Sequence, residues 1–261
     1  MVTANFALLS IGLAVALFLA MMLMLEVGRR VGVERTKTRG NKARAGVGVV
    51  DGSVYGLLAL LAGFMFSGAA NRFDQRRTLV GEIANAAQRS WRRVALLPDE
   101  LRSPVRDALR RYMDGLVSYY TGPVAPRHHL EFPPQLTQAE DSLWSRSVAA
   151  CKAPGGEPAR MLLLPALSET FDAVERERVA RRIHPSPLIY VMFGISALAT
   201  ALFAGYGMAS GPVRNWMYTV GIAASISIAT YVIIELEYPR LGLVRVSGMD
   251  QLLVEARDSM K

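Results

Sequence analysis

Four long apolar runs dominate the pattern of hydrophobic and polar residues along this chain. Each run is close to the roughly 20 residues that a helix needs to cross the core of a bilayer. The first run lacks the basic start of a signal peptide and is too long for one, so we expect it to be retained. The pattern predicts four transmembrane helices: Phe6–Val27, Val49–Ala70, Leu188–Met208 and Trp216–Ile234.

A long and mostly polar insert separates the second and third runs. Its charged first part, Phe73–Leu97, is expected to continue the second helix out of the membrane. Its last part, Met161–Ile183, has the pattern of an amphipathic helix that returns to the membrane. Between them, capping signals predict two further helix starts, one at Ser103 before Pro104 and one at the Thr137/Glu140 capping box. Gly122–Pro134, with four prolines, is expected to be a loop.

These elements predict an all-α integral membrane protein in three parts. Residues 1–70 hold the first two transmembrane helices and a basic connecting loop, Gly28–Gly46. Residues 71–185 form a helical extramembrane insert. Residues 186–261 hold the third and fourth transmembrane helices and a short C-terminal tail.

The amino-acid composition supports a membrane protein and limits which binding partners are expected. Hydrophobic residues make up 51% of the 261 residues and the mean hydropathy is +0.23, which excludes an ordinary soluble enzyme and a disordered chain. The net charge of +8 is interpreted as a topology signal and as attraction to anionic lipid. Nucleic acid is not an expected partner, because no face concentrates basic residues with aromatic ones.

The sequence carries none of the common catalytic or metal-binding motifs. The single cysteine, Cys151, excludes an internal disulfide and a cysteine-based zinc site. Two of the three histidines, His128 and His129, are adjacent in the proline-rich stretch, which disfavours a histidine metal site. We therefore expect a protein that is not an enzyme and that needs no cofactor and no metal.

The second run has a narrow face of small and polar residues. At about 100° per residue this face is continuous, with Asn71 at its edge. Two interpretations stay open: the small residues allow close packing of membrane helices, or they line a central axis that Leu60 or Phe64 constricts by dewetting. The face consists of Gly52, Gly56, Leu60, Gly63, Ser67 and Asp74.

Ionisable residues at the membrane boundaries allow a structural and a functional interpretation. Asp51, which we expect in the first turn of the second helix, either interacts with the helix dipole or serves a function inside the membrane. The stretches Asn71–Arg77 and Glu235–Gly242 are either solvated faces with ordinary ion pairs, or an ion-attracting vestibule or subunit contact.

Several of these stretches resemble an uncharacterised bacterial membrane family that is described as bestrophin-like and is distantly similar to bestrophin ion channels. The resemblance covers most of the chain. It rests on Gly56–Phe64, Asn71–Asp74, Glu82–Ala86, Leu96–Pro98 with Arg102, Arg110–Tyr112 and Glu237–Ser247.

The resemblance implies an oligomeric channel, mostly anion-selective, with the second span around a central pore. The chain departs from the bestrophin pattern in two ways. It has one aromatic candidate for the constriction, Phe64, instead of a row of bulky residues, and it lacks the run of consecutive acids that binds calcium in animal bestrophins. The implied pore-lining residues are Gly56, Leu60, Phe64 and Ser67, and the implied pore-mouth residues are Asn71, Arg72, Asp74, Glu235 and Glu237.

The leading hypothesis is therefore a homo-oligomeric, anion-conducting channel whose partners are the lipid bilayer, further copies of the chain and small inorganic ions. The alternative is a non-conducting membrane scaffold or sensor whose helical insert binds a partner. We expect a multi-pass protein of the bacterial inner membrane. The basic loop Gly28–Gly46 favours an external insert by the positive-inside rule, whereas the resemblance favours a cytoplasmic insert, which we adopt.

Overall fold

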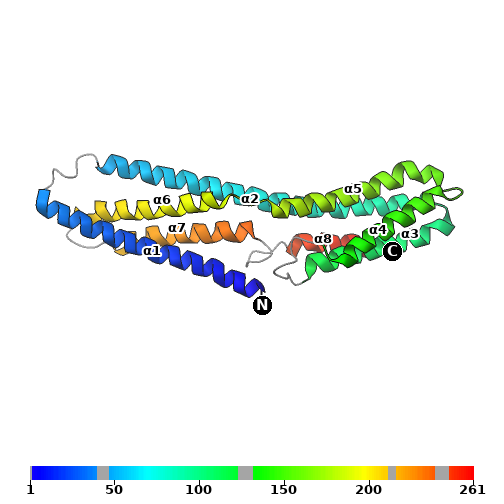
Figure 1. The fold of residues 1–261 in the computed structure, drawn as a ribbon, viewed down its shortest axis with the longest axis horizontal. Helices are drawn as coiled ribbons and strands as arrows, with labels where there is room; N and C mark the ends of the chain where they lie inside the picture. The colour runs from blue at the N-terminus through cyan, green and yellow to red at the C-terminus, as the bar shows by residue number, and fades with distance from the viewer. Residues whose placement is uncertain (1, 40–46, 123–131, 211–215, 239–246) are drawn as a thin grey trace. The chain divides into compact units, whose positions relative to one another are not determined.

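The computed structural model describes residues 2–39, 47–122, 132–210, 216–238 and 247–261, and in this part of the chain it contains helices and no strand. Figure 1 shows the helices in chain order. They are α1 (Val2–Arg39), α2 (Val47–Val94), α3 (Asp99–Thr121), α4 (Pro134–Lys152), α5 (Glu157–Arg182), α6 (Pro187–Gly207), the short 3-10 helix η2 (Met208–Ser210), α7 (Trp216–Glu237) and α8 (Ser247–Asp258).

The chain divides into two compact units. Unit 1 holds Thr3–Asn71 and His184–Leu243, which include α1, the first part of α2, α6 and α7. Unit 2 holds Arg72–Ile183 and Val244–Lys261, which include the rest of α2 with α3, α4, α5 and α8. Helix α2 therefore contributes to both units.

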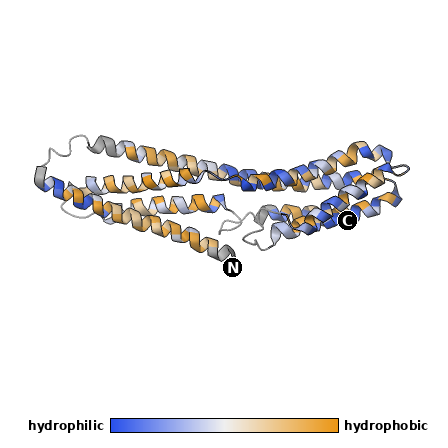
Figure 2. Ribbon diagram, viewed as in Figure 1, coloured by the Kyte–Doolittle hydropathy of each residue, from blue (hydrophilic) through white to orange (hydrophobic). Residues whose placement is uncertain are grey.

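Four segments are long and apolar enough to cross a membrane. In Figure 2 the helices of unit 1 carry most of the hydrophobic residues, whereas those of unit 2 alternate hydrophobic and hydrophilic positions. The four predicted transmembrane helices are confirmed in α1, α2, α6 and α7. The predicted continuation of the second helix through the charged segment is also confirmed, because α2 runs without a break to Val94.

Helix α1 extends beyond its predicted end, so the prediction of a loop over Gly28–Gly46 is wrong up to Arg39. Glu26 pairs with Arg29 at 3.5 Å and with Arg30 at 2.8 Å, one helical turn apart, and such pairs stabilise a helix. Residues 40–46 lie outside the described residues. Asp51 lies beyond the first turn of α2, so its predicted place in that turn is also wrong.

Close backbone contact joins α1 to α6 inside unit 1. A Cβ atom on Gly28 would collide with the backbone carbonyl of Leu202, and one on Gly205 would collide with that of Leu25. Ala201, next to Leu202, is fully buried. Small residues thus let the two helix backbones approach, which is a common packing device in membranes.

Unit 2 is a helical assembly with its own apolar core. Tyr112 and Leu116 of α3, Leu143 of α4 and Leu167 of α5 are fully buried in it. From α8, Leu253 enters the same core, although the sequence predicted only a short tail there. Such burial provides the main stabilisation of a helical domain.

The starts of α3 and α4 differ from their predicted capping sites. Helix α3 begins at Asp99, so Pro104 lies inside it, and acidic residues occupy the first turn, where they favour the positive end of the helix dipole. Helix α4 begins at Pro134, and proline is well tolerated in a first turn. The Ser103 and Thr137 caps are therefore wrong, because stronger start signals precede them.

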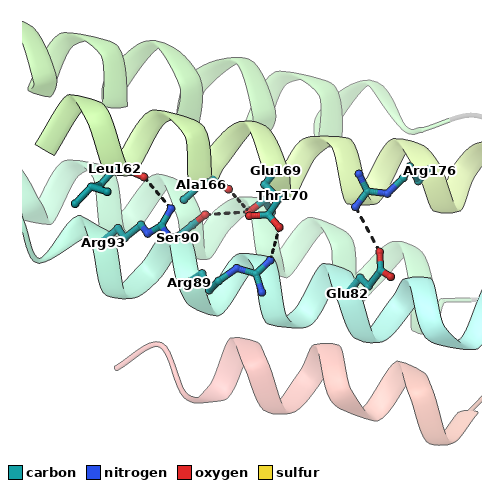
Figure 3. Close-up of polar contacts among 9 residues, drawn as sticks. All are labelled: Glu82, Arg89, Ser90, Arg93, Leu162, Ala166, Glu169, Thr170 and Arg176. Carbon is teal, nitrogen blue, oxygen red and sulfur yellow. Dashed lines mark hydrogen bonds and ion pairs between the residues drawn. The ribbon is translucent and has the colours of Figure 1, made fainter.

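A ladder of polar contacts joins α2 to the antiparallel helix α5 within unit 2 (Figure 3). The pairs are Glu82 with Arg176 at 3.4 Å and Arg89 with Glu169 at 2.7 Å. Between the helices, the buried hydroxyl groups of Ser90 and Thr170 lie 2.9 Å apart. These contacts fix the register of the two helices.

Candidate functional site

The side of α2 that faces away from the unit 1 core carries the residues singled out in the sequence. Gly56, Leu60, Phe64 and Ser67 are all exposed. Leu60 and Phe64 expose 54% and 67% of their surface, large fractions for apolar side chains. The opposite side of α2 packs into the core through Leu58, Met65 and Ala69.

The glycines on this exposed face of α2 do not pack against any other helix of the described chain. A Cβ atom added at Gly52, Gly56 or Gly63 would meet nothing within 4 Å. The close-packing interpretation therefore does not hold for these glycines within one chain. Close packing is instead found at Gly28 and Gly205, on α1 and α6.

An apolar groove of about 710 Å³ lies beside the exposed face, between α2 and α7. Tyr55 and Ala59 of α2, Gly221 and Ala229 of α7, and Phe193 of α6 line this groove. The groove has almost no polar surface, as expected for a surface that contacts lipid or another membrane helix.

The predicted mouth residues on α2 fall at the division between the units. Asn71 is the last α2 residue of unit 1 and is exposed. Arg72 and Asp74 belong to unit 2, where Arg72 is half-buried and Asp74 is exposed. Asp74 lies 3.7 Å from Arg77, so its charge is partly balanced by a neighbour one turn away.

The two acidic mouth candidates on α7 are buried inside unit 1. Glu235 accepts a hydrogen bond from the Ser10 hydroxyl at 3.1 Å. Glu237 lies 3.0 Å from Nδ1 of His184, whose ring stacks on Tyr238. Both carboxylates are thus engaged with the start of α1 and with the segment before α6, and neither is exposed.

Sequence reasoning missed the partners of these carboxylates. Ser10 and Glu235 are 225 positions apart, and nothing in either stretch signals that they meet. His184 carries a weak signal, because it is the one histidine at a predicted membrane boundary. In the described part of the chain, no three His, Cys, Asp or Glu side chains come together in a way that could hold a metal ion.

The chain belongs to the bestrophin-like family, because the family model "Bestrophin-like domain" matches residues 13–249. No curated protein sequence matches it. Its fold is similar to that of a bacterial bestrophin homologue from Klebsiella pneumoniae, solved as a variant with one tyrosine replaced by alanine. The two chains are 15% identical, with a TM-score of 0.66, and the match covers 95% of this chain and 98% of that one.

Proposed function

We propose that the chain forms a homo-oligomeric membrane channel that conducts small inorganic anions, with α2 nearest the central axis. One observation carries the proposal: an apolar, membrane-length part of α2 exposes glycine, serine and asparagine rather than packing them. In an oligomer this face would line a path for ions.

The contrast with α1 argues against lipid as the partner of this face. Exposed positions of α1 carry large apolar side chains such as Leu8, Leu19 and Leu23, which suit contact with acyl chains. The exposed face of α2 instead carries the small residues Gly56 and Ser67 on either side of its two large residues, Leu60 and Phe64. Polar and small residues at membrane depth are favoured where they face protein or a water-filled path.

Leu60 and Phe64 supply the gate in this proposal. Both are large, apolar and exposed on the side of α2 that would face the axis. Rings of such side chains close a narrow pore to ions by excluding water, whereas the glycines around them keep the rest of the path open. The gate in this proposal is therefore apolar.

The proposed mouth consists of Asn71, Arg72 and Asp74 on α2. Glu235 and Glu237, engaged inside unit 1, hold the end of α7 in place rather than forming an exposed ring. Membership in the bestrophin-like family and the fold shared with a bacterial bestrophin homologue support a channel in the inner membrane. We place the insert, residues 71–185, in the cytoplasm.

Flux of chloride and potassium from liposomes tests this function. We compare the purified wild type with Phe64→Ala, with empty vesicles and with Phe66→Ala as a matched control. Phe66 is also exposed, at 48%, but two residues correspond to about 200° around a helix, so it points away from Phe64. We expect chloride flux through the wild type, a several-fold increase for Phe64→Ala, and no change for Phe66→Ala.

The alternative, a non-conducting scaffold or sensor, predicts a different result. It gives no flux in any variant although the protein is folded and oligomeric by size-exclusion chromatography, and that result would overturn the channel proposal. Equal flux through both phenylalanine variants would remove Phe64 from the gate while retaining the channel.

A further inference from the structure

A line of exposed residues follows α2 at steps of seven positions. Phe64, Asn71, Thr78, Asn85 and Arg92 are all exposed. Seven residues are close to two helical turns, so each residue in this line lies nearly above the previous one, with a drift of about 20° per step. The line begins at the proposed gate and ends, in unit 2, at an arginine.

Most other charges on α2 in unit 2 have a partner. Asp74 pairs with Arg77, Glu82 with Arg176, and Arg89 with Glu169. Arg76 donates hydrogen bonds to the carbonyl of Ala180 in the last turn of α5 and to that of Ile183 just beyond it. Arg93 donates to the carbonyl of Leu162 near the start of α5. These contacts neutralise or occupy the charged groups beside the exposed line.

Arg92 differs from these residues. Its side chain is exposed, and in the described part of the chain it has no hydrogen bond, ion pair or ring contact. On the same side of α2, Thr78 and Asn85 are neutral, and the charged residues Asp74, Glu82 and Arg89 each have a partner. Among the residues of the exposed line, Arg92 therefore carries the one positive charge without a described partner, at the far end of the line.

We propose that Arg92 is the residue that sets the anion preference of the channel: one guanidinium from each copy forms a positive ring around the extramembrane end of the ion path. This inference rests on the proposed function, because the ring exists only if copies of α2 surround an axis. The ligand class is a small inorganic anion such as chloride.

A ring of this kind acts through its long-range potential rather than through tight binding. Each guanidinium adds a positive potential at the axis, and the potentials of all copies add. The ring raises the local anion concentration and lowers the cation concentration without a dehydrated site, so anions pass quickly. The effect depends on salt, because screening shortens the range of exposed charges.

A structural role for Arg92 makes a different prediction. Arg92 lies in the last turn of α2, where a positive charge also stabilises the negative end of the helix dipole. If that were its only role, replacing it would lower thermal stability and leave the ratio of anion to cation flux unchanged. Arg111 on α3 provides a control, because it too is exposed and has no described partner.

The experiment measures the chloride-to-potassium permeability ratio of the full-length protein in planar bilayers. The variants are Arg92→Gln, Arg92→Glu and Arg111→Gln, each checked for melting temperature and oligomeric state. We expect Arg92→Gln to lower the ratio at least about threefold and Arg92→Glu to lower it further, because the charge at the ring changes sign. Arg111→Gln should leave the ratio unchanged.

Salt dependence completes the test. The difference between wild type and Arg92→Gln should be larger at about 0.05 M than at about 0.5 M salt, because the Debye length falls from above about 10 Å to below about 5 Å. Ion flux with an unchanged ratio in both Arg92 variants overturns this inference and leaves the channel intact. Absence of flux in the folded wild-type oligomer overturns the proposed function, and this inference with it.

Discussion

Gly28 on α1 lies directly against the backbone carbonyl of Leu202 on α6. A methyl group at position 28 has no room, since the obstacle is backbone rather than a flexible side chain. We expect Gly28→Ala to separate the two helices and to lower the free energy of unfolding by about 1–3 kcal/mol, the usual cost of overpacking. Thermal unfolding in detergent measures the loss.

Gly56→Ala is the matched control for this prediction. Nothing lies within 4 Å of the position that its new methyl group would occupy in a single chain. The melting temperature of the isolated chain should therefore stay constant or rise slightly, because alanine favours a helix over glycine. Equal destabilisation by both substitutions would contradict the assignment of the packing glycines to α1 and α6.

Arg76 is expected to be essential for the stability of unit 2. It exposes only 5% of its surface and donates hydrogen bonds to the carbonyls of Ala180 and Ile183 at the end of α5. Arg76→Gln should cost about 2 kcal/mol, because two part-buried hydrogen bonds from a charged donor are lost. The neighbouring exposed variant Arg77→Gln should cost little in the same denaturation experiment, since surface ion pairs contribute little.

Glu140 makes the stability of unit 2 depend on pH. Burial raises the pKa of Glu140, the nearby acids Asp141 and Glu175 add to this rise, and the hydrogen bond from Tyr112 and the charge of Arg178 oppose it. A raised pKa means that the folded state binds the proton more tightly than the unfolded state. The free energy of unfolding therefore falls as the pH rises from the usual carboxyl range through the raised pKa.

Glu140→Gln should remove this penalty. We expect a higher melting temperature at pH 7, with a gain below about 1 kcal/mol because the site is partly solvated. The gain should disappear near pH 4, where both states of the wild type carry the proton. A gain that is independent of pH would contradict this explanation and point to packing instead.

Cys151 should react slowly with maleimides. The thiol is buried, and burial raises its pKa although Arg160 opposes the shift, so little thiolate is present at neutral pH. A better probe of orientation is Lys152→Cys in a Cys151→Ser background, because position 152 is exposed. With a cytoplasmic insert, a membrane-impermeant maleimide should label this cysteine only after permeabilisation. Labelling in intact cells would place the insert outside.

The sequence predicted those parts of the fold that depend on local patterns. The spans in α1, α2, α6 and α7 follow from apolar runs, and the exposed face of α2 follows from helical spacing. The loop at Gly28 was wrongly predicted because the apolar run ends at Val27 and basic residues follow, whereas Gly28 packs against α6 and the helix continues. Tertiary packing outweighed the local signal at these positions.

Contacts between distant parts of the chain were beyond sequence reasoning. The hydrogen bond from Ser10 to Glu235 and the burial of Leu253 of α8 join segments that no spacing rule connects. The α2 residues predicted to share a face are exposed together, as helical spacing requires, whereas their role in a pore stays a prediction. Arg92 was not singled out in the sequence, although it follows Asn71 at the same seven-residue spacing.

The place of α8 in unit 2 has a consequence for how the protein is made. Arg110 of α3 donates a 2.7 Å hydrogen bond to the carbonyl of Met260, and Arg257 pairs with Asp114 at 3.4 Å. Arg257 and Met260 are synthesised only after α6 and α7. Domains generally fold as units during synthesis, and unfinished ones expose apolar surface. Unit 2 therefore completes its fold only after the whole chain has been synthesised, and until then its unfinished core exposes apolar surface.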